Sequence, residues 1–90
     1  MSMSKTDIIE HLKKELPGEL HGVEEYMQLA EEAWENNDHI AAEMLMQIAG
    51  DEHDHAKYII HQIESNGGSL EPTIKEKFHK LEQNIMKHYK

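Results

Sequence analysis

Residues 50–56 decide how the rest of the chain is interpreted, and they read Gly50-Asp51-Glu52-His53-Asp54-His55-Ala56. The run lies near the middle of a long expected helix, and it places a carboxylate and an imidazole one helical turn apart, at Glu52 and His55. An apolar stripe passes through the same two positions, and it consists of Ala41, Leu45, Ile48, Glu52, His55, Ile59 and Ile63. At roughly 100° per residue these positions project within an arc of about 80°. Glu52 and His55 are therefore expected on the buried face of the helix.

The first helix has a counterpart of Glu52 on its own apolar stripe. Glu19 is flanked there by residues that project within roughly 60° of it, namely Leu12, Leu16, Val23 and Tyr26. If the chain turns near residues 36–37, Glu19 lies about 17.5 residues before the turn and Glu52 about 15.5 after it, which at ~1.5 Å per residue is a height difference of only about 3 Å. A buried carboxylate is costly unless it is paired or binds a metal. Glu19, Glu52 and His55 are therefore expected to converge as a metal site.

Helix signals cover the chain, and they predict one all-α domain over residues 1–90. The expected helices are 4–35, capped by Ser4 or Thr6, then 38–64, capped by Asn37 or Asp38, and 72–88, with Pro72 in its first turn. The stripe of the first helix stays in phase through Pro17, which predicts either one helix kinked there or two nearly coaxial helices. The short connection at 36–37 forces the first two helices into an antiparallel hairpin.

The third helix carries its own stripe, Ile74, Phe78, Leu81, Ile85 and Tyr89. Residues 71–90 hold five lysines and three glutamates, a net charge of +2, whereas residues 1–70 hold four lysines and fifteen acidic residues, a net charge of −11. We expect this basic helix to pack on the acidic hairpin partly by charge attraction.

Composition excludes several classes of function. The chain has no cysteine, which excludes disulfides, thiolate zinc sites and a rubredoxin-type iron centre within it. A net charge of −9 argues against nucleic acid and anionic membranes as partners. The N-terminal residues lack the apolar run of a signal peptide, so the expected compartment is the cytoplasm. At 90 residues the core is small, which favours help from a metal or from self-association.

The polar residues around the Glu52–His55 pair are assigned to solvent. His53 and Asp54 lie about 100° and 200° from Glu52 around the helix. Asp51 is expected at the surface, with orientation of a ligand histidine as the alternative. His21 lies about 160° from Glu19 and is expected to be exposed, an auxiliary metal site being the lesser alternative.

Tyr26 has two readings of equal weight. It follows Glu19 by two turns on the same face, and it is either an ordinary core residue or a hydrogen-bond partner of a ligand carboxylate. Glu52 and Tyr26 are accordingly the candidate catalytic residues. The methionines at 27, 44, 46 and 86 are expected to pack rather than to bind metal.

One hairpin supplies half of a known ligand set. Helical two-metal proteins use a glutamate from each of two helices and Glu-x-x-His from each of the other two. A homodimer, or a higher homo-oligomer, would present Glu19, Glu52 and His55 twice and form a four-helix bundle. Such carboxylate-rich ligands suit iron, with manganese as the alternative, and we expect two metal ions per dimer. Three alternatives stay open. One is a buried Glu19–His55 hydrogen bond that only fixes register, and another is a metal-stabilised or metal-free helical interaction protein without turnover. The third is an iron-delivery or buffering protein that binds Fe(II) reversibly without oxidising it.

These motifs resemble the first half of the rubrerythrin branch of the ferritin-like superfamily. The resemblance rests on Gly18-Glu19, on Tyr26 seven residues after Glu19, and on Glu52-x-x-His55-Ala56-Lys57. It covers roughly residues 15–65. A single hairpin that pairs to build the bundle is similar to the encapsulated ferritins of half-ferritin type.

The resemblance implies a non-haem di-iron centre bound by Glu19, Glu52 and His55. It implies Fe(II) oxidation by oxygen or peroxide, in iron handling or protection from oxidative stress. This sequence departs from the family because no second hairpin and no rubredoxin domain follow, so an external electron donor is implied. Residues 85–90 show no encapsulin-docking extension. The expected location is therefore the cytoplasm, with an encapsulin compartment as the alternative.

Overall fold

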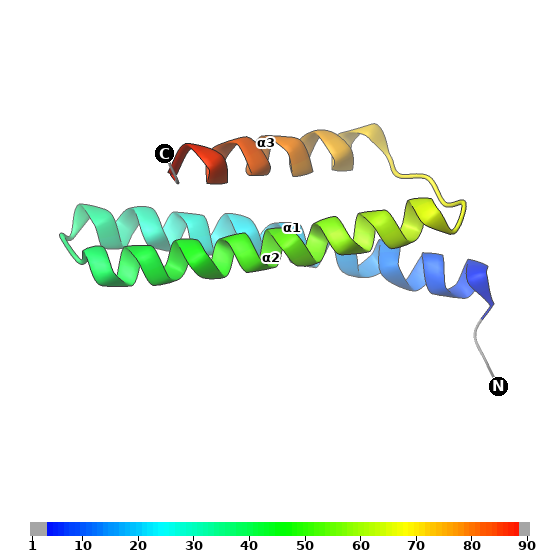
Figure 1. The fold of residues 1–90 in the computed structure, drawn as a ribbon, viewed down its shortest axis with the longest axis horizontal. Helices are drawn as coiled ribbons and strands as arrows, with labels where there is room; N and C mark the ends of the chain where they lie inside the picture. The colour runs from blue at the N-terminus through cyan, green and yellow to red at the C-terminus, as the bar shows by residue number, and fades with distance from the viewer. Residues whose placement is uncertain (1–3, 89–90) are drawn as a thin grey trace.

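The computed structural model describes residues 4–88, which form three helices and no strand. α1 (Lys5–Glu35) and α2 (His39–Ser65) make an antiparallel hairpin, and α3 (Pro72–His88) lies along one side of it (Figure 1). The all-α prediction is confirmed. The molecule measures 51 × 27 × 17 Å, so it is long and thin. None of the helices in residues 4–88 is long and apolar enough to cross a membrane.

α1 begins with a capping box. The Ser4 hydroxyl accepts from the backbone N–H of Asp7 at 3.1 Å, and the Asp7 carboxylate accepts from the backbone N–H of Ser4 at 3.3 Å. The helix then continues through Pro17 as a single element, which decides between the two alternatives left by the sequence. Residues 1–3 of the N-terminal segment, and Tyr89 at the end of the predicted third stripe, lie outside the described residues.

Both connections reverse the chain with residues that tolerate left-handed backbone. Asn37 has φ 60°, and Asp38 is the N-cap of α2, where its carboxylate accepts from the backbone N–H of Ala41 at 3.1 Å. After α2, Gly67 has φ 87°, a conformation that glycine adopts without a Cβ clash. The N–H of Gly68 then donates a hydrogen bond to the carbonyl of Ile63 at 2.9 Å, which gives this carbonyl in the last turn of α2 a partner.

The core runs between the two hairpin helices and is extended on one side by α3. α1 and α2 contribute most of its buried side chains, and α3 adds Phe78, Leu81 and Ile85. The hairpin part of this cluster consists of Leu16, Leu20, Val23, Ala30, Met46, Ala56, Ile59, Ile60 and Ile63. Since α3 covers one side only, the other side of the hairpin has no covering element among residues 4–88 (Figure 1).

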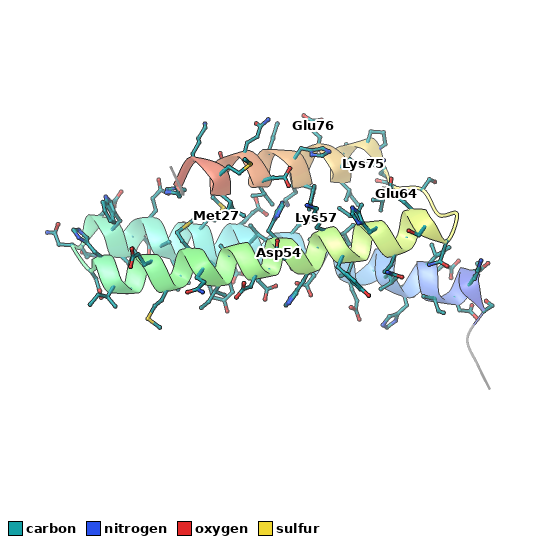
Figure 2. All side chains as sticks on the ribbon, in the orientation of Figure 1. Met27, Asp54, Lys57, Glu64, Lys75 and Glu76 are labelled. Atoms are coloured by element: carbon teal, nitrogen blue, oxygen red, sulfur yellow. The ribbon has the colours of Figure 1, made fainter. Side chains whose placement is uncertain are left out.

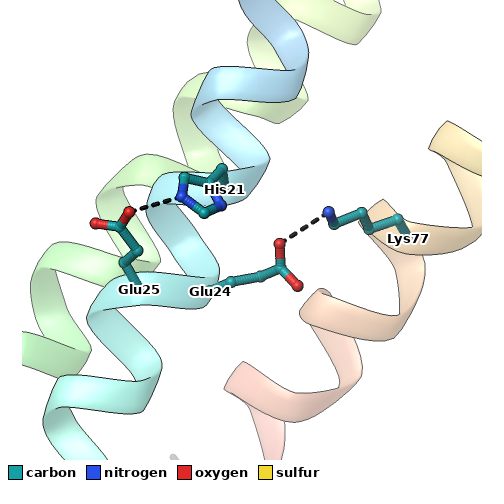
Figure 3. A network of polar contacts seen from close by, with 4 residues as sticks. All are labelled: His21, Glu24, Glu25 and Lys77. Carbon is teal, nitrogen blue, oxygen red and sulfur yellow. Dashed lines mark ion pairs between the residues drawn. The ribbon is translucent and has the colours of Figure 1, made fainter.

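Lysines of α3 pair with acidic residues of the hairpin. The ammonium of Lys75 lies 2.6 Å from a carboxylate oxygen of Glu64 near the end of α2 (Figure 2). Lys77 reaches Glu24 of α1 at 2.8 Å (Figure 3). These contacts agree with the attraction expected between the basic third helix and the acidic hairpin. All four side chains are 41–46% exposed, so each pair contributes little to stability.

Candidate metal site

Glu19, Glu52 and His55 form a cluster whose ligand atoms all lie within 4.8 Å of one another. Glu19 comes from α1, and the other two residues come from successive turns of α2. The hairpin brings them to one level because its turn lies nearly midway between them in the sequence. Within residues 4–88 this is the only group of three or more histidine, aspartate or glutamate side chains whose ligand atoms lie this close together.

The cluster is less buried than its place on an apolar stripe predicts. The Glu19 side chain is 27% exposed and that of His55 is 65% exposed, with 4.0 Å between His55 Nδ1 and Glu19 Oε2. Ile48, on the same stripe, is 37% exposed. The expected burial of His55 and Ile48 is therefore wrong for the single chain. The reason is that α3 packs on the opposite side of the hairpin and leaves this face uncovered.

One carboxylate oxygen at the centre of the cluster is buried and unsatisfied. Glu19 Oε2 has almost no accessible surface and finds no hydrogen-bond partner among the described residues. When both carboxylates are ionised, no proton lies between Glu19 and Glu52. A proton on Glu19 allows a hydrogen bond with Glu52, and this bond, followed by burial and the charge of Glu52, raises the pKa of Glu19.

These residues fit a bound cation. A metal would supply the partner that Glu19 Oε2 lacks and would offset the repulsion between the two carboxylates. Two carboxylates and one imidazole are ligands that iron and manganese accept. Glu19, Glu52 and His55 are therefore the side chains that would hold the metal.

His53 is the clearest correction to the sequence-based assignment. Its angle on α2 predicts solvent exposure, but His53 is 5% exposed and its ring stacks on Phe78 of α3, with 4.3 Å between ring centroids. The prediction assumes that α2 packs on one helix through a single apolar stripe. In the structure α2 packs on two helices, α1 and α3, so a second face of α2 is also buried. A second series on α2 marks the α3 side, and all its members are buried: Ala42, Met46, Ala49, His53 and Ile60. Their spacings of four, three, four and seven residues are helical, so this signal was present in the sequence.

Other predicted residues lie close to their expected positions. Asp51 and Asp54 are exposed on α2. His21 is exposed on α1 and lies 2.6 Å from a carboxylate oxygen of Glu25 (Figure 3). Tyr26 is half-buried on the α1 stripe two turns after Glu19, which leaves both of its readings standing.

Exposed apolar side chains surround the cluster. We call this surface the open face and define it by Ile8 and Leu29 of α1 and Met44 and Ile48 of α2. Each projects within about 80° of the ligand residue on its own helix. Their exposed fractions are 41%, 46%, 60% and 37%. The cluster thus shares its side of the hairpin, opposite α3, with these four exposed apolar side chains and with the exposed His11–Glu15 pair.

The family model described as Rubrerythrin matches residues 10–89, which is most of the chain. No curated protein matches, and no solved structure matches.

Proposed function

This chain belongs to the rubrerythrin family, and from that premise we propose that it is a non-haem di-iron carboxylate protein that oxidises Fe(II). The Glu19–Glu52–His55 cluster is the observation that carries the proposal, because its ligand atoms lie within 4.8 Å of one another. Oxygen or peroxide is the proposed oxidant. When peroxide is used, two Fe(II) ions give one electron each, and peroxide takes up two protons and leaves as two waters.

A second copy of the chain completes the proposed site. One hairpin holds a single set of three ligands, which is half of what two-metal helical bundles use. The open face lies on the same side of the hairpin as this set, so pairing two open faces about a two-fold axis would bury its exposed apolar side chains. The paired hairpins would make a four-helix bundle with two copies of Glu19, Glu52 and His55 at its centre, for two iron ions per dimer.

Each ligand has a distinct role in this proposal. Bound iron supplies the one-electron chemistry that the side chains lack. Glu52 and His55 would hold the iron from α2, and Glu19 would complete the ligand set from α1. A hydrogen bond with Glu52 and burial raise the pKa of Glu19, and a bound cation would lower it. Tyr26 lies on the same face, and its hydroxyl would donate a hydrogen bond to a ligand carboxylate.

Fe(II) binding and oxidation test the proposal in sequence. Anaerobic titration should give two Fe(II) per dimer, with mass determined by light scattering. Admission of air or peroxide should then give Fe(III) absorbance with consumption of the oxidant. Glu52→Gln and His55→Ala should abolish both. Glu43→Gln and His61→Ala are the matched controls, since both residues are exposed on α2 about 180° from Glu52.

The outcomes separate this proposal from its alternatives. Reversible Fe(II) binding without oxidation would make the protein an iron buffer or delivery protein and would refute turnover. A dimer that binds no metal would make it a helical interaction protein. Oxidation by Glu52→Gln as fast as by wild type would refute the assigned site.

A further inference from the structure

Gly22 lies one turn after Glu19 on α1, and its missing side chain leaves space that Glu52 occupies. A Cβ built on Gly22 would lie 3.3 Å from Glu52 Oε2, 3.7 Å from its Cδ and 3.9 Å from its Cγ. The end of the Glu52 side chain therefore crosses from α2 and rests against the backbone of α1. Apart from Gly22, its two chain neighbours and the nearby backbone of α1, these are the three nearest atoms to this position.

The backbone at residue 22 does not itself require glycine. Residue 22 is inside α1, and Gly67 is the glycine of residues 4–88 with positive φ. Glycine within a helix is less stable than alanine because it loses more conformational freedom on folding. Helix formation therefore disfavours Gly22, and the contact with Glu52 is the feature that an added methyl group would disturb.

Gly18 shows that this contact is specific to one glycine. It lies one turn before Gly22 in the same helix, and a Cβ there would meet nothing within 4 Å. Alanine at residue 18 would enter open space. Alanine at residue 22 would push the Glu52 carboxylate by a few tenths of an ångström, and this carboxylate is the one that lies beside Glu19 and raises its pKa.

We infer that Gly22 is a positioning residue for the metal site: the absence of its side chain lets the Glu52 carboxylate reach across to Glu19. The inference rests on the proposed function, because it concerns the same site. It adds a residue that binds no metal and acts only by leaving space. Residues that orient metal ligands through hydrogen bonds change metal affinity by roughly 10- to 100-fold when altered, and we take the lower end of that range for a residue that acts only by leaving space.

Two pairs of variants test the inference: Gly22→Ala with Gly18→Ala, and Gly22→Val with Gly18→Val. Fe(II) affinity is measured by anaerobic titration calorimetry. We expect Gly22→Ala to weaken binding roughly tenfold and Gly22→Val to weaken it further, whereas the Gly18 variants bind as wild type. The melting temperature of metal-free Gly18→Ala should rise by on the order of 5 °C. If Gly22 has no role beyond the helix itself, Gly22→Ala should raise the melting temperature by the same amount and leave the Fe(II) affinity unchanged.

The results distinguish failure of the inference from failure of the proposed function. Wild type and Gly22→Ala binding Fe(II) equally well would overturn the role of Gly22 and leave the metal site intact. Wild type that binds no Fe(II) would overturn both. Circular dichroism and light scattering show whether each variant folds and pairs. If Gly22→Val does neither, the alanine pair decides.

Discussion

Removing apolar surface from the open face should break the proposed dimer. The double substitution Met44→Gln/Ile48→Gln keeps side-chain size and helix propensity nearly constant while adding polar atoms. Met44 is 60% and Ile48 37% exposed in the single chain. If burying a whole side chain contributes ~2 kcal/mol, the exposed parts contribute about 1.2 and 0.7 kcal/mol.

A two-fold dimer counts each substitution twice, which gives a total of about 4 kcal/mol. At 1.4 kcal/mol per tenfold, the dissociation constant should rise between about 100- and 1,000-fold. Sedimentation velocity over a dilution series measures this change. Because the proposed site needs both chains, Fe(II) binding should weaken over the same concentration range in which the dimer dissociates.

Met86→Gln is the matched control for this experiment. Met86 is 61% exposed, almost the same as Met44, but it lies on α3 and away from the open face. Its substitution should leave the dissociation constant unchanged. Equal weakening by the control and the double variant would refute the open face as the interface. Undiminished Fe(II) binding by a dissociated double variant would refute a site shared between chains.

Three further predictions follow from individual contacts. Because the pKa of Glu19 is raised above 4.5, the metal-free protein should lose stability as pH rises from about 4.5 through that raised pKa. Glu19→Gln should flatten this loss in urea unfolding and should abolish Fe(II) binding. A Glu19→Gln variant with the wild-type pH profile would contradict the assigned cause. Phe78→Ala, which removes the ring stacked on His53, should lower the free energy of unfolding by about 3–5 kcal/mol, and a loss under 1 kcal/mol would show that α3 is not held there. Lys77→Ala breaks the exposed pair with Glu24 and should change stability by less than about 1 kcal/mol, with the difference vanishing in high salt; a larger, salt-independent loss would indicate buried packing instead.

The sequence predicts the level and rotation of the cluster, but it does not show which face is covered. The helical period determines which residues share a face, and the short turn determines which levels of the two helices meet, so the sequence predicts that Glu19, Glu52 and His55 lie together. Solvent exposure depends on where the third helix packs. The position of α3 follows from Phe78 and from the second series on α2, so a single apolar face per helix places His53 wrongly in solvent.

Gly22 illustrates a different limit of sequence reasoning. The periodicity of apolar residues is silent about glycine, because glycine contributes no side chain to either face. Its role becomes visible only when the path of the Glu52 side chain is known. Packing between two side chains can be inferred from the apolar stripes of two helices. A space that one residue leaves for another side chain can be recognised only from the three-dimensional structure.

The stack between His53 and Phe78 gives the protein a built-in spectroscopic reporter. A ring held 4.3 Å from another at an interplanar angle of 17° experiences a ring-current shift of its imidazole resonances, and this shift disappears when α3 leaves. His53 is next to Glu52 in the chain, so a paramagnetic ion in the cluster would broaden the same resonances. One imidazole can therefore follow both the docking of α3 and the loading of iron in a single titration.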